Sequence, residues 1–404
     1  MKLWFRYLIG TVVGIGVGLF IPLLGGDSLA VLRVLSDILI RVGRLFLFPM
    51  AFFAIVIAVD ELRDGGRVGS VAGKAAVLTA GSVVVAVVLA VVVMSVFQPQ
   101  RIPPMVQEAP VAVPPSAVEL FRRALPLNGF QVFVLDGNAL VMILLVGALI
   151  GWTLRYDREI TSPVLLVSDS ANRIFYRLNG GLTSVLGFLL AIPAGMVVVS
   201  VRETPDLQLF GQFLIVVATA AVVMGAVVYP LALYLFRRDA RAPVEWLTRM
   251  GAPSLAALLG GDIFFATPTL VTVGKEELRL PRSVGGSVSY VVAVFSRAGS
   301  ALVAVAAFLL VIRSYTALEI GFGETVGIAV TAVLSSFLLG RTPAGSVTLL
   351  LSYLAVSYGR GMDESYLILL PVLPLLERLG VWLDVMTHSF ITFAVAESED
   401  LRTY

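Results

Sequence analysis

The sequence contains two polar interruptions that decide the fold, Phe265-Ala266-Thr267-Pro268-Thr269 and Gly340-Arg341-Thr342-Pro343-Ala344-Gly345-Ser346. Each carries a Thr-Pro pair inside a broken apolar segment, at roughly 244–280 and 318–358, and an unbroken apolar span follows each. Proline removes a backbone donor and breaks a helix, and non-helical backbone at membrane depth is tolerated only beside protein or a water-filled cavity. A matched pair of interrupted segments indicates a transporter site built on inverted repeats. We therefore predict two re-entrant helical hairpins; the alternative is two kinked helices in a packed bundle.

The composition of the whole chain requires a membrane. Of its 404 residues 58% are hydrophobic and 14% are charged, whereas soluble domains carry about 25% charged residues. Apolar stretches long enough to cross a bilayer lie at roughly 7–24, 29–59, 75–97, 133–154, 181–201, 210–236, 285–312 and 364–395. The second exceeds the bilayer and should tilt or project beyond it. A cleaved signal peptide would resemble the first stretch, but its length favours a retained helix.

The basic residues indicate on which side of the membrane each span ends. One side of the membrane would hold Lys2, Arg6, Arg63, Arg67, Lys74, Arg155, Arg158, Arg173, Arg177, Arg237, Arg238, Arg241 and Lys275. The other side would hold Arg101, Arg122, Arg123, Arg202 and Arg313. We expect the protein to lie in the inner membrane, and the positive-inside rule then places both termini in the cytoplasm. The first span also carries Gly10, Gly14 and Gly18, and such a stripe predicts close helix packing.

Several functions are excluded by what the chain lacks. It has no cysteine and one histidine, so disulfides, thiolate metal sites and His-rich metal sites are ruled out. A net charge of +2 without a basic, aromatic-rich run gives no indication of nucleic-acid binding. No His-Glu-x-x-His, Gly-x-Ser-x-Gly or cysteine nucleophile is present. We expect no enzyme, no metal site and no cofactor.

The last span contains three ionisable residues, Glu377, Asp384 and His388. At about 100° per residue, steps of seven and eleven residues return to within about 20° of the starting direction, so all three share one helix face. Each ionisable group inside a membrane costs about 2.5–3.5 kcal/mol on insertion scales, and such groups are functional candidates. The alternative is that Asp384 and His388 lie at the cytoplasmic end and are solvated.

The chain resembles the dicarboxylate/amino acid:cation symporter family, which has the glutamate-transporter fold. The resemblance extends over nearly the whole chain, although no single family motif is intact. It is carried by Asp37 to Arg44 with Phe48-Pro49-Met50, by Leu125 to Phe130 with Asn138 and Thr153 to Tyr156, by the tip Thr342 to Ser346, and by Ala394 to Glu397. The tip is similar to the family's Val-Pro-Gly-Ala-Gly.

The resemblance implies a homotrimer of independent protomers, each an all-α polytopic membrane protein with eight transmembrane helices, two hairpins and an elevator mechanism. Residues 1–74 and 133–208 would form the static scaffold, with helices one, two, four and five. Residues 75–97 and 209–404 would form the mobile transport unit, with both hairpins. Residues 98–132 would form an extracytoplasmic loop, and the second hairpin would be the outer gate.

The family pattern also implies roles for single residues. Glu377 falls where an Asp contacts the substrate amino group, and Gly380 where an Arg grips the substrate's side-chain carboxylate. Asp384 replaces an Asn that contacts substrate and ion, and His388 replaces a sodium-binding Asp. The seventh span's Ser296-Arg297-Ala298-Gly299-Ser300 aligns with Asn-Met-Asp-Gly-Thr, and Asp262 to Phe265 aligns with the Ser-rich first tip. Two sodium-ligating carboxylates are thus missing, and sodium prefers oxygen ligands.

Two arginines have no counterpart in that pattern. An Arg in mid-span needs a partner, for which Glu377 or Asp384 is expected, and we hypothesise that Arg297 is a tethered cation in place of sodium. Arg341 can hold a carboxylate in a bidentate pair, or it is an exposed arginine bound to water or lipid phosphate. We predict substrate contacts from Arg297, Ser300, Arg341, Thr342, Pro343, Ala344, Gly345, Glu377, Gly380 and Asp384. We predict coupling-ion or proton contacts from Ser296, Glu377, Asp384 and His388.

These features favour a secondary active transporter of a small carboxylate, either an amino acid such as glutamate or aspartate or a dicarboxylate. Sodium or protons would drive it, and histidine titrates nearest neutrality. The alternatives are a transporter of neutral amino acids and a channel-like or non-transporting relative. Saturable uptake would distinguish a carrier from both a channel and an inactive relative.

Overall fold

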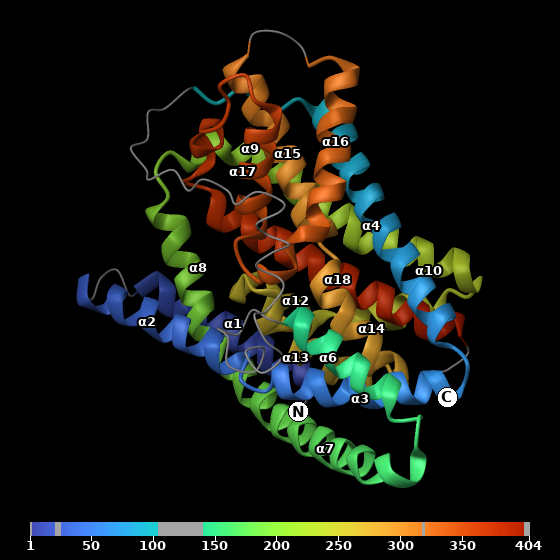
Figure 1. Ribbon diagram of the computed structural model, residues 1–404. Coiled ribbons are helices and arrows are strands. Elements are labelled where there is room, and N and C mark those ends of the chain that lie inside the picture. The colour runs from blue at the N-terminus through green and yellow to red at the C-terminus, as the bar shows by residue number, and fades with distance from the viewer. Residues whose placement is uncertain (1, 21–25, 104–139, 317–319, 400–404) are drawn as a thin grey trace.

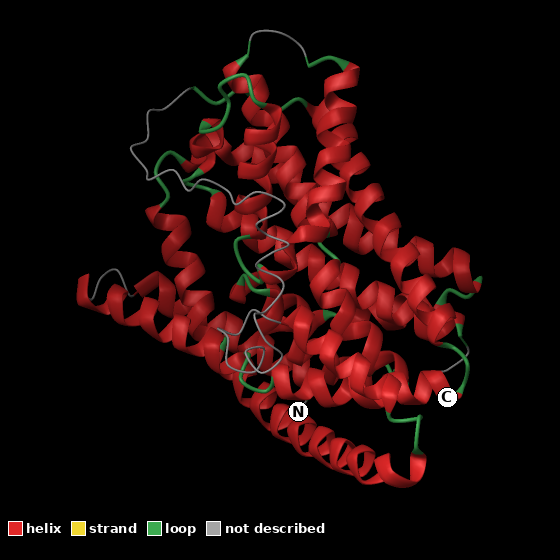
Figure 2. Cartoon of the chain, in the orientation of Figure 1, coloured by secondary structure: helices red, strands yellow, loops and turns green. Residues whose placement is uncertain are grey.

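The computed structural model describes residues 2–20, 26–103, 140–316 and 320–399, and these contain helices and no strand (Figure 2). The helices of the first half are α1 (Leu3–Phe20), α2 (Gly26–Gly43), α3 (Leu47–Asp64), α4 (Val68–Phe97), α6 (Leu140–Thr153), α7 (Arg158–Leu189), α8 (Ala191–Glu203), α9 (Leu207–Val223), the π-helix η3 (Met224–Val228) and α10 (Tyr229–Arg237). Those of the second half are α11 (Arg241–Arg249), α12 (Gly251–Gly260), α13 (Ile263–Glu276), α14 (Arg282–Phe295), α15 (Ala298–Tyr315), α16 (Phe322–Ser336), η4 (Phe337–Arg341), α17 (Ser346–Tyr358), η5 (Ser365–Leu369) and α18 (Leu373–Ser398). The all-α polytopic prediction is confirmed.

Eight helical stretches within the described residues are long and apolar enough to cross a membrane. Seven of them correspond to predicted spans. The predicted span at 133–154 is described only as the 14-residue helix α6, and Phe322–Arg341, which we assigned to a broken segment, is long enough instead. The predicted loop at 98–132 lies outside the described residues from 104 onward, as do Leu125 to Phe130 and Asn138.

Two predicted spans are not continuous. The long stretch at 29–59 divides into α2 and α3 at the turn Arg44–Phe46. The stretch at 285–312, which we predicted as one unbroken span, is interrupted at Ser296 and Arg297, where the backbone leaves the helical conformation between α14 and α15. The segments on both sides are apolar, and neither residue of the break is proline or glycine. The break could therefore not be predicted from the sequence.

The first helical hairpin consists of α12 and α13, and its tip corrects one prediction. The chain turns at Gly261, whose φ is +62°, and Asp262 accepts a hydrogen bond from the Phe265 N–H at the start of α13. Pro268, where we predicted the break, lies inside α13. The Pro268 carbonyl accepts bonds from Asn179 and Thr272, and the helix continues through it. The left-handed glycine and the cap therefore set this tip, not the proline.

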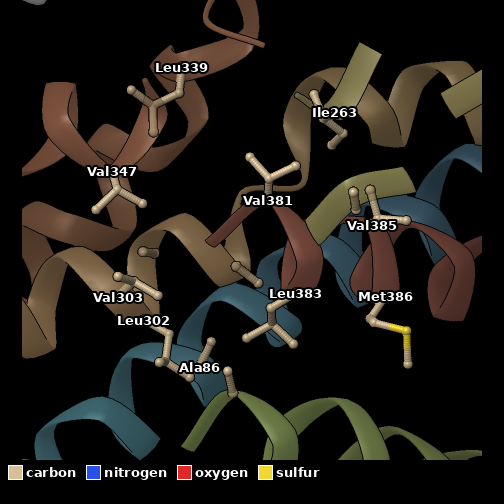
Figure 3. Packing of buried hydrophobic residues seen from close by; sticks show 14 of the residues in the cluster. Ala86, Ile263, Leu302, Val303, Leu339, Val347, Val381, Leu383, Val385 and Met386 are labelled. Carbon is tan, nitrogen blue, oxygen red and sulfur yellow. The ribbon is translucent and has the colours of Figure 1, made fainter. Parts of the chain in front are cut away.

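The second hairpin consists of α16 with η4 and of α17, and its break falls where we predicted it. Thr342, Pro343 and Ala344 are non-helical, and Gly345 has a φ of +78° before α17 begins. The Ile263 N–H at the first tip donates to the Pro343 carbonyl at 3.0 Å. In Figure 3 the α18 residue Val381 lies between Ile263 of the first tip and Val347 of the second arm. The two tips thus meet against α18.

The helices pack in two groups (Figure 1). In one group α1 packs on α7 and α8, and α3 packs on α6 and α7. In the other, α15 and α18 form a centre covered by α4, α9, α14 and α17, with α16 beside α4. The first hairpin and α14 lie between the groups and contact α1, α2, α3 and α7. The predicted scaffold and transport units, with their boundaries and relative motion, stay predictions.

The N and C marks lie in the lower half of Figure 1. Several basic residues that we assigned to the cytoplasmic side form ion pairs with acidic residues. Arg158 contacts Asp60 and Asp64, and Arg237 pairs with Glu397. Partial burial alone would raise the pKa of Glu399, but hydrogen bonds from Lys74 and Ser70 hold it below its usual range.

The predicted glycine stripe of α1 is confirmed as a packing surface. A Cβ on Gly10, Gly14 or Gly18 would meet backbone oxygens at Gly187, Ala191 and Gly195 within 2.2, 2.3 and 2.6 Å. Gly16, on the same helix, has nothing within 4 Å of the corresponding position. The backbone of α1 therefore approaches the end of α7 and the start of α8 so closely that only glycine fits at the contact.

We expect Gly14→Leu to destabilise the protein by about 1–3 kcal/mol, the usual effect of overpacking a filled interface. Gly16→Leu is the matched control and should leave the unfolding midpoint in detergent nearly unchanged. Equal midpoints for the two variants would show that the α1–α8 contact is not close-packed.

Candidate substrate site

The N-terminus of α17, just after the second tip, is held by a carboxylate of α18. Glu377 Oε1 accepts from the Thr348 N–H and from the Thr348 hydroxyl, each at 2.6 Å. Glu377 Oε2 accepts from the Val347 N–H at 3.2 Å. The first N–H groups of a helix have no partner within the helix, and the helix dipole favours an anion there. Glu377 is therefore fully used in fixing the second hairpin.

The N-terminus of α15 is held in the same way two turns further along α18. Asp384 Oδ1 accepts from the Gly299 N–H at 2.7 Å and from the Ser300 N–H at 3.1 Å. The Ser300 hydroxyl donates to Oδ2 at 2.6 Å. In both places the carboxylate takes the N–H groups of the second and third helical residues and the hydroxyl of the third. The side chain of Asp384 is fully buried, so it is not a solvated residue at the membrane surface.

Close backbone contact makes this second cap possible. A Cβ on Gly299 would lie 2.3 Å from the Gly380 carbonyl and 2.6 Å from the Asp384 nitrogen. A Cβ on Gly380 would lie 2.6 Å from Val347 Cγ2. Gly380, where the family pattern has an arginine, thus has no room for a side chain. The carboxylate-binding arginine of the family cannot be accommodated at this position.

Arg297 lies in the break between α14 and α15 and is fully buried. Its Nη1 is 3.9 Å from Asp384 Oδ2, which confirms Asp384 as its nearest expected partner. That separation is too long for a hydrogen bond. Nε, Nη1 and Nη2 all lack a hydrogen-bond partner among the described residues. Asp384 balances the charge of Arg297, but the donors of the guanidinium are unused.

Two further unpartnered atoms belong to residues that we predicted for the same site. They are the Ser296 hydroxyl, next to Arg297, and His388 Nδ1, both fully buried. His388 Nε2 bonds the Ser289 hydroxyl of α14 at 2.8 Å. A buried polar group without a partner costs about 1–3 kcal/mol. The unpartnered atoms of Ser296 and Arg297, neighbours at the helix break, therefore indicate a ligand that accepts hydrogen bonds.

The second tip packs against this break. A Cβ on Gly340 would lie 2.8 Å from Val294 Cγ1, two residues before Ser296. Among the described contacts of the tip, the Thr342 hydroxyl donates to the Leu339 carbonyl, and Ser346 donates to the Thr342 carbonyl. Arg341 is half-buried, and the described residues offer it no ion pair within 4.0 Å. Roles of Arg341, Thr342, Pro343, Ala344 and Gly345 in binding stay predictions.

Among the predicted residues the structure brings Asp384 together with Arg297 and Ser300, and the side chains of the predicted set have different contacts. Glu377 and Asp384 are helix caps, whereas Arg297, Ser296 and His388 present free hydrogen-bonding atoms. Sequence reasoning missed Ser289 and Thr348, which are ordinary helix hydroxyls without any local signal. A guanidinium, a hydroxyl and an imidazole in a closed apolar setting can bind a small anion, for which a carboxylate has matching geometry.

Two hairpin tips that meet against α18, inside a bundle of helices long and apolar enough to cross a membrane, are the architecture of a multi-pass membrane protein. The comparison with protein families specifies the class. The model of the sodium:dicarboxylate symporter family matches residues 3–398, and the chain belongs to this family.

Individual relatives are distant. A C4-dicarboxylate transport protein of Paraburkholderia phymatum is 24% identical over 363 residues, which are 86% of this chain and 81% of the relative. The protein with that name in Deinococcus radiodurans is 24% identical over 201 residues, 47% of this chain and 42% of the relative. The match therefore spans less than half of the Deinococcus protein.

We expect Asp384→Asn to cost about 3–5 kcal/mol of stability, because it leaves Arg297 buried without a counter-charge and weakens the α15 cap. Adding Arg297→Met to Asp384→Asn should recover part of this loss, since the uncompensated charge is then gone. Thermal unfolding in detergent measures both variants, and Asp363→Asn, at an exposed position, is the control. Strictly additive losses would contradict a coupled Arg297–Asp384 pair.

Proposed function

We propose that the protein is a secondary carrier of small carboxylates, in which Arg297 binds the substrate carboxylate. The observation that supports this most directly is the buried guanidinium whose three nitrogens have no hydrogen-bond partner. A carboxylate would pair with it in a bidentate manner and satisfy donors that the protein leaves unused. The names of the relatives agree with such a substrate.

The substrate does not need an amino group. In the family pattern the residue at 377 contacts that group, but here both oxygens of Glu377 accept bonds from α17. Asp384 is likewise occupied by α15. Since neither acid is free for an ammonium group, a C4-dicarboxylate fits the site better than aspartate, glutamate or a neutral amino acid.

Arg297 also replaces the sodium ion of this region. Ala298 and His388 stand where the family pattern has sodium-binding carboxylates, and a fixed guanidinium beside them supplies the positive charge for the anion. A permanent cation in a low-dielectric interior attracts an anion more strongly than it would in water. It would also repel a second cation at the same place.

Transport would follow the elevator mechanism. The packing of α4, α9, α16, α17 and α18 around α15 supports a mobile unit, and the first hairpin and α14 would form its contact with a static scaffold of α1–α3 and α6–α8. The scaffold would assemble as a homotrimer in the inner membrane with both termini in the cytoplasm. The second hairpin would open as a gate, because its tip covers the break that holds Arg297.

Uptake of labelled succinate into liposomes that contain the purified protein should saturate with concentration, and it should persist when choline replaces sodium. Arg297 remains in place under both conditions, so removing sodium does not remove the compensating charge. Loss of all uptake in choline would end the tethered-cation hypothesis. Flux that rises without saturation would indicate a channel.

Arg297→Met should weaken succinate binding by about 100-fold, because truncating one partner of a buried charge pair costs about 2–5 kcal/mol. Thermal stabilisation of the protein by succinate measures this change, since a ligand of the folded state raises its stability by mass action. Arg341→Gln is the matched arginine variant, and we expect a smaller loss. The opposite order would assign the substrate to Arg341.

A further inference from the structure

His388, the single histidine of the chain, connects the substrate site to a second polar region. Nδ1 of its fully buried ring is unpartnered, and its Nε2 is bonded to the Ser289 hydroxyl at 2.8 Å. Ser289 is itself one of the residues that line a cavity of about 410 Å³. One nitrogen of the imidazole is therefore unpartnered, and the other is one hydroxyl away from the cavity.

The cavity lies between α3, α7, α13, α14 and α18, and it reaches the surface at Arg173, Lys275 and Arg282. We assigned Arg173 and Lys275 to the cytoplasmic side. Its lining reaches α18 at Ser389 and Thr392, which belong to the helical turn that follows His388. The space and its polar groups suit several water molecules, each of which needs two to four partners. The Ser289 hydroxyl can thus exchange protons with water.

The ionisable groups near His388 are few. The break before α15 presents Arg297, the charge that acts on the ring. Asp384 is one turn away on α18, where α15 binds both of its oxygens. From α10 the Tyr229 hydroxyl bonds Thr387 instead, and near the ends of α18 Glu377 bonds α17 and Glu397 pairs with Arg237. Burial is the main obstacle to charging the imidazole, and the positive charge of Arg297 adds to it.

We propose that His388 carries the proton that accompanies the substrate anion, and that Ser289 passes this proton between His388 and the cavity. This inference rests on the proposed carboxylate transport. An imidazolium beside a bare guanidinium is repelled strongly in a low-dielectric site. An anion on Arg297 removes that repulsion, so anion and proton are bound together. Nδ1–H of the imidazolium is then a donor for the anion.

The proton transfer balances without any further reactant. In the starting tautomer Nε2–H donates to Ser289 Oγ, and Nδ1 takes up one proton to give the imidazolium. Nε2–H then passes its proton to Ser289 Oγ, while the original hydroxyl proton leaves to cavity water. Nδ1 takes its proton from a hydronium ion in the substrate pathway, Nε2 gives one up to cavity water, and the ring is then neutral with its hydrogen on Nδ1. When the emptied substrate site is open to the cytoplasm, Nδ1–H gives its proton to water there and Nε2 takes one from cavity water through Ser289. This reset restores the first tautomer without moving a proton across the membrane.

The test uses the full-length protein in liposomes with a trapped pH-sensitive dye. Wild-type protein should acidify the lumen when succinate enters. Ser289→Ala should reduce this succinate-driven proton flux at least about 10-fold, the lower end of what a positioned proton-transfer group contributes. Exchange of labelled for unlabelled succinate should stay near the wild-type rate, because it moves no net proton and Ser289 does not contact the substrate site.

Three further variants make the result specific. Ser289→Thr keeps the hydroxyl and should restore the flux. Ser287→Ala removes a hydroxyl that bonds only its own helix, at the Ser283 carbonyl, and should change nothing. His388→Asn should abolish the proton flux. A merely structural role of Ser289 would lower exchange and proton flux together.

Each outcome decides the relay. Proton flux that survives Ser289→Ala or His388→Asn overturns it. Net uptake of succinate by the wild-type protein without any acidification of the lumen also overturns it, but leaves the proposed carboxylate carrier intact. If wild-type protein neither binds nor exchanges succinate or aspartate, the proposed function fails, and the relay falls with it.

Discussion

The structure depends on two carboxylates of one helix that cap the N-termini of two others. A helix that starts at membrane depth exposes N–H groups where no water can satisfy them, and each such group costs several kcal/mol. Glu377 accepts hydrogen bonds from such N–H groups at the start of α17, and Asp384 does so at the start of α15. Each carboxylate accepts three bonds, two from N–H groups and one from a hydroxyl. The helix dipoles in turn stabilise the two buried anions. Without these caps, the second tip and the break at Arg297 have no support.

This use of the two acids explains why Arg297 is available. Its charge is balanced at 3.9 Å by Asp384, but the oxygens of Asp384 are already occupied by α15. The guanidinium is therefore compensated in charge and unsatisfied in hydrogen bonds. A free cation would find neither an open acid nor a favourable field beside it. A carboxylate from solution satisfies both the donors and the electrostatics, and this combination is the basis of the proposed specificity.

Part of this arrangement could be predicted from the sequence. Helical periodicity places Glu377, Asp384 and His388 on one face, and the structure shows each of them bonded to a different packed element. Pro343 with Gly345 marked the second tip, because proline ends a helix and glycine takes the left-handed conformation after it. The need of a buried arginine for an acid identified Asp384 as a partner. These inferences depend on local pattern and on single-residue chemistry.

What failed depends on contacts distant in the chain. Pro268 is held in α13 by Asn179 of α7, whereas the first tip is formed at Gly261 and Asp262. The break at Ser296 and Arg297 exists because Asp384, 85 residues away, satisfies the start of α15. The cap that Glu377 forms was not predicted either, since the position of Val347 and Thr348 relative to α18 cannot be read from sequence. Ser289 carries no signal at all.

A structure of the protein with saturating succinate tests the central claim most directly. The account predicts that one carboxylate of the ligand lies about 2.7–2.9 Å from the guanidinium nitrogens of Arg297, the spacing of charge-assisted hydrogen bonds. Asp384 and Glu377 should remain on α15 and α17. Ligand bound elsewhere with the guanidinium still unpartnered, or either acid released from its helix to hold the substrate or a cation, would contradict it.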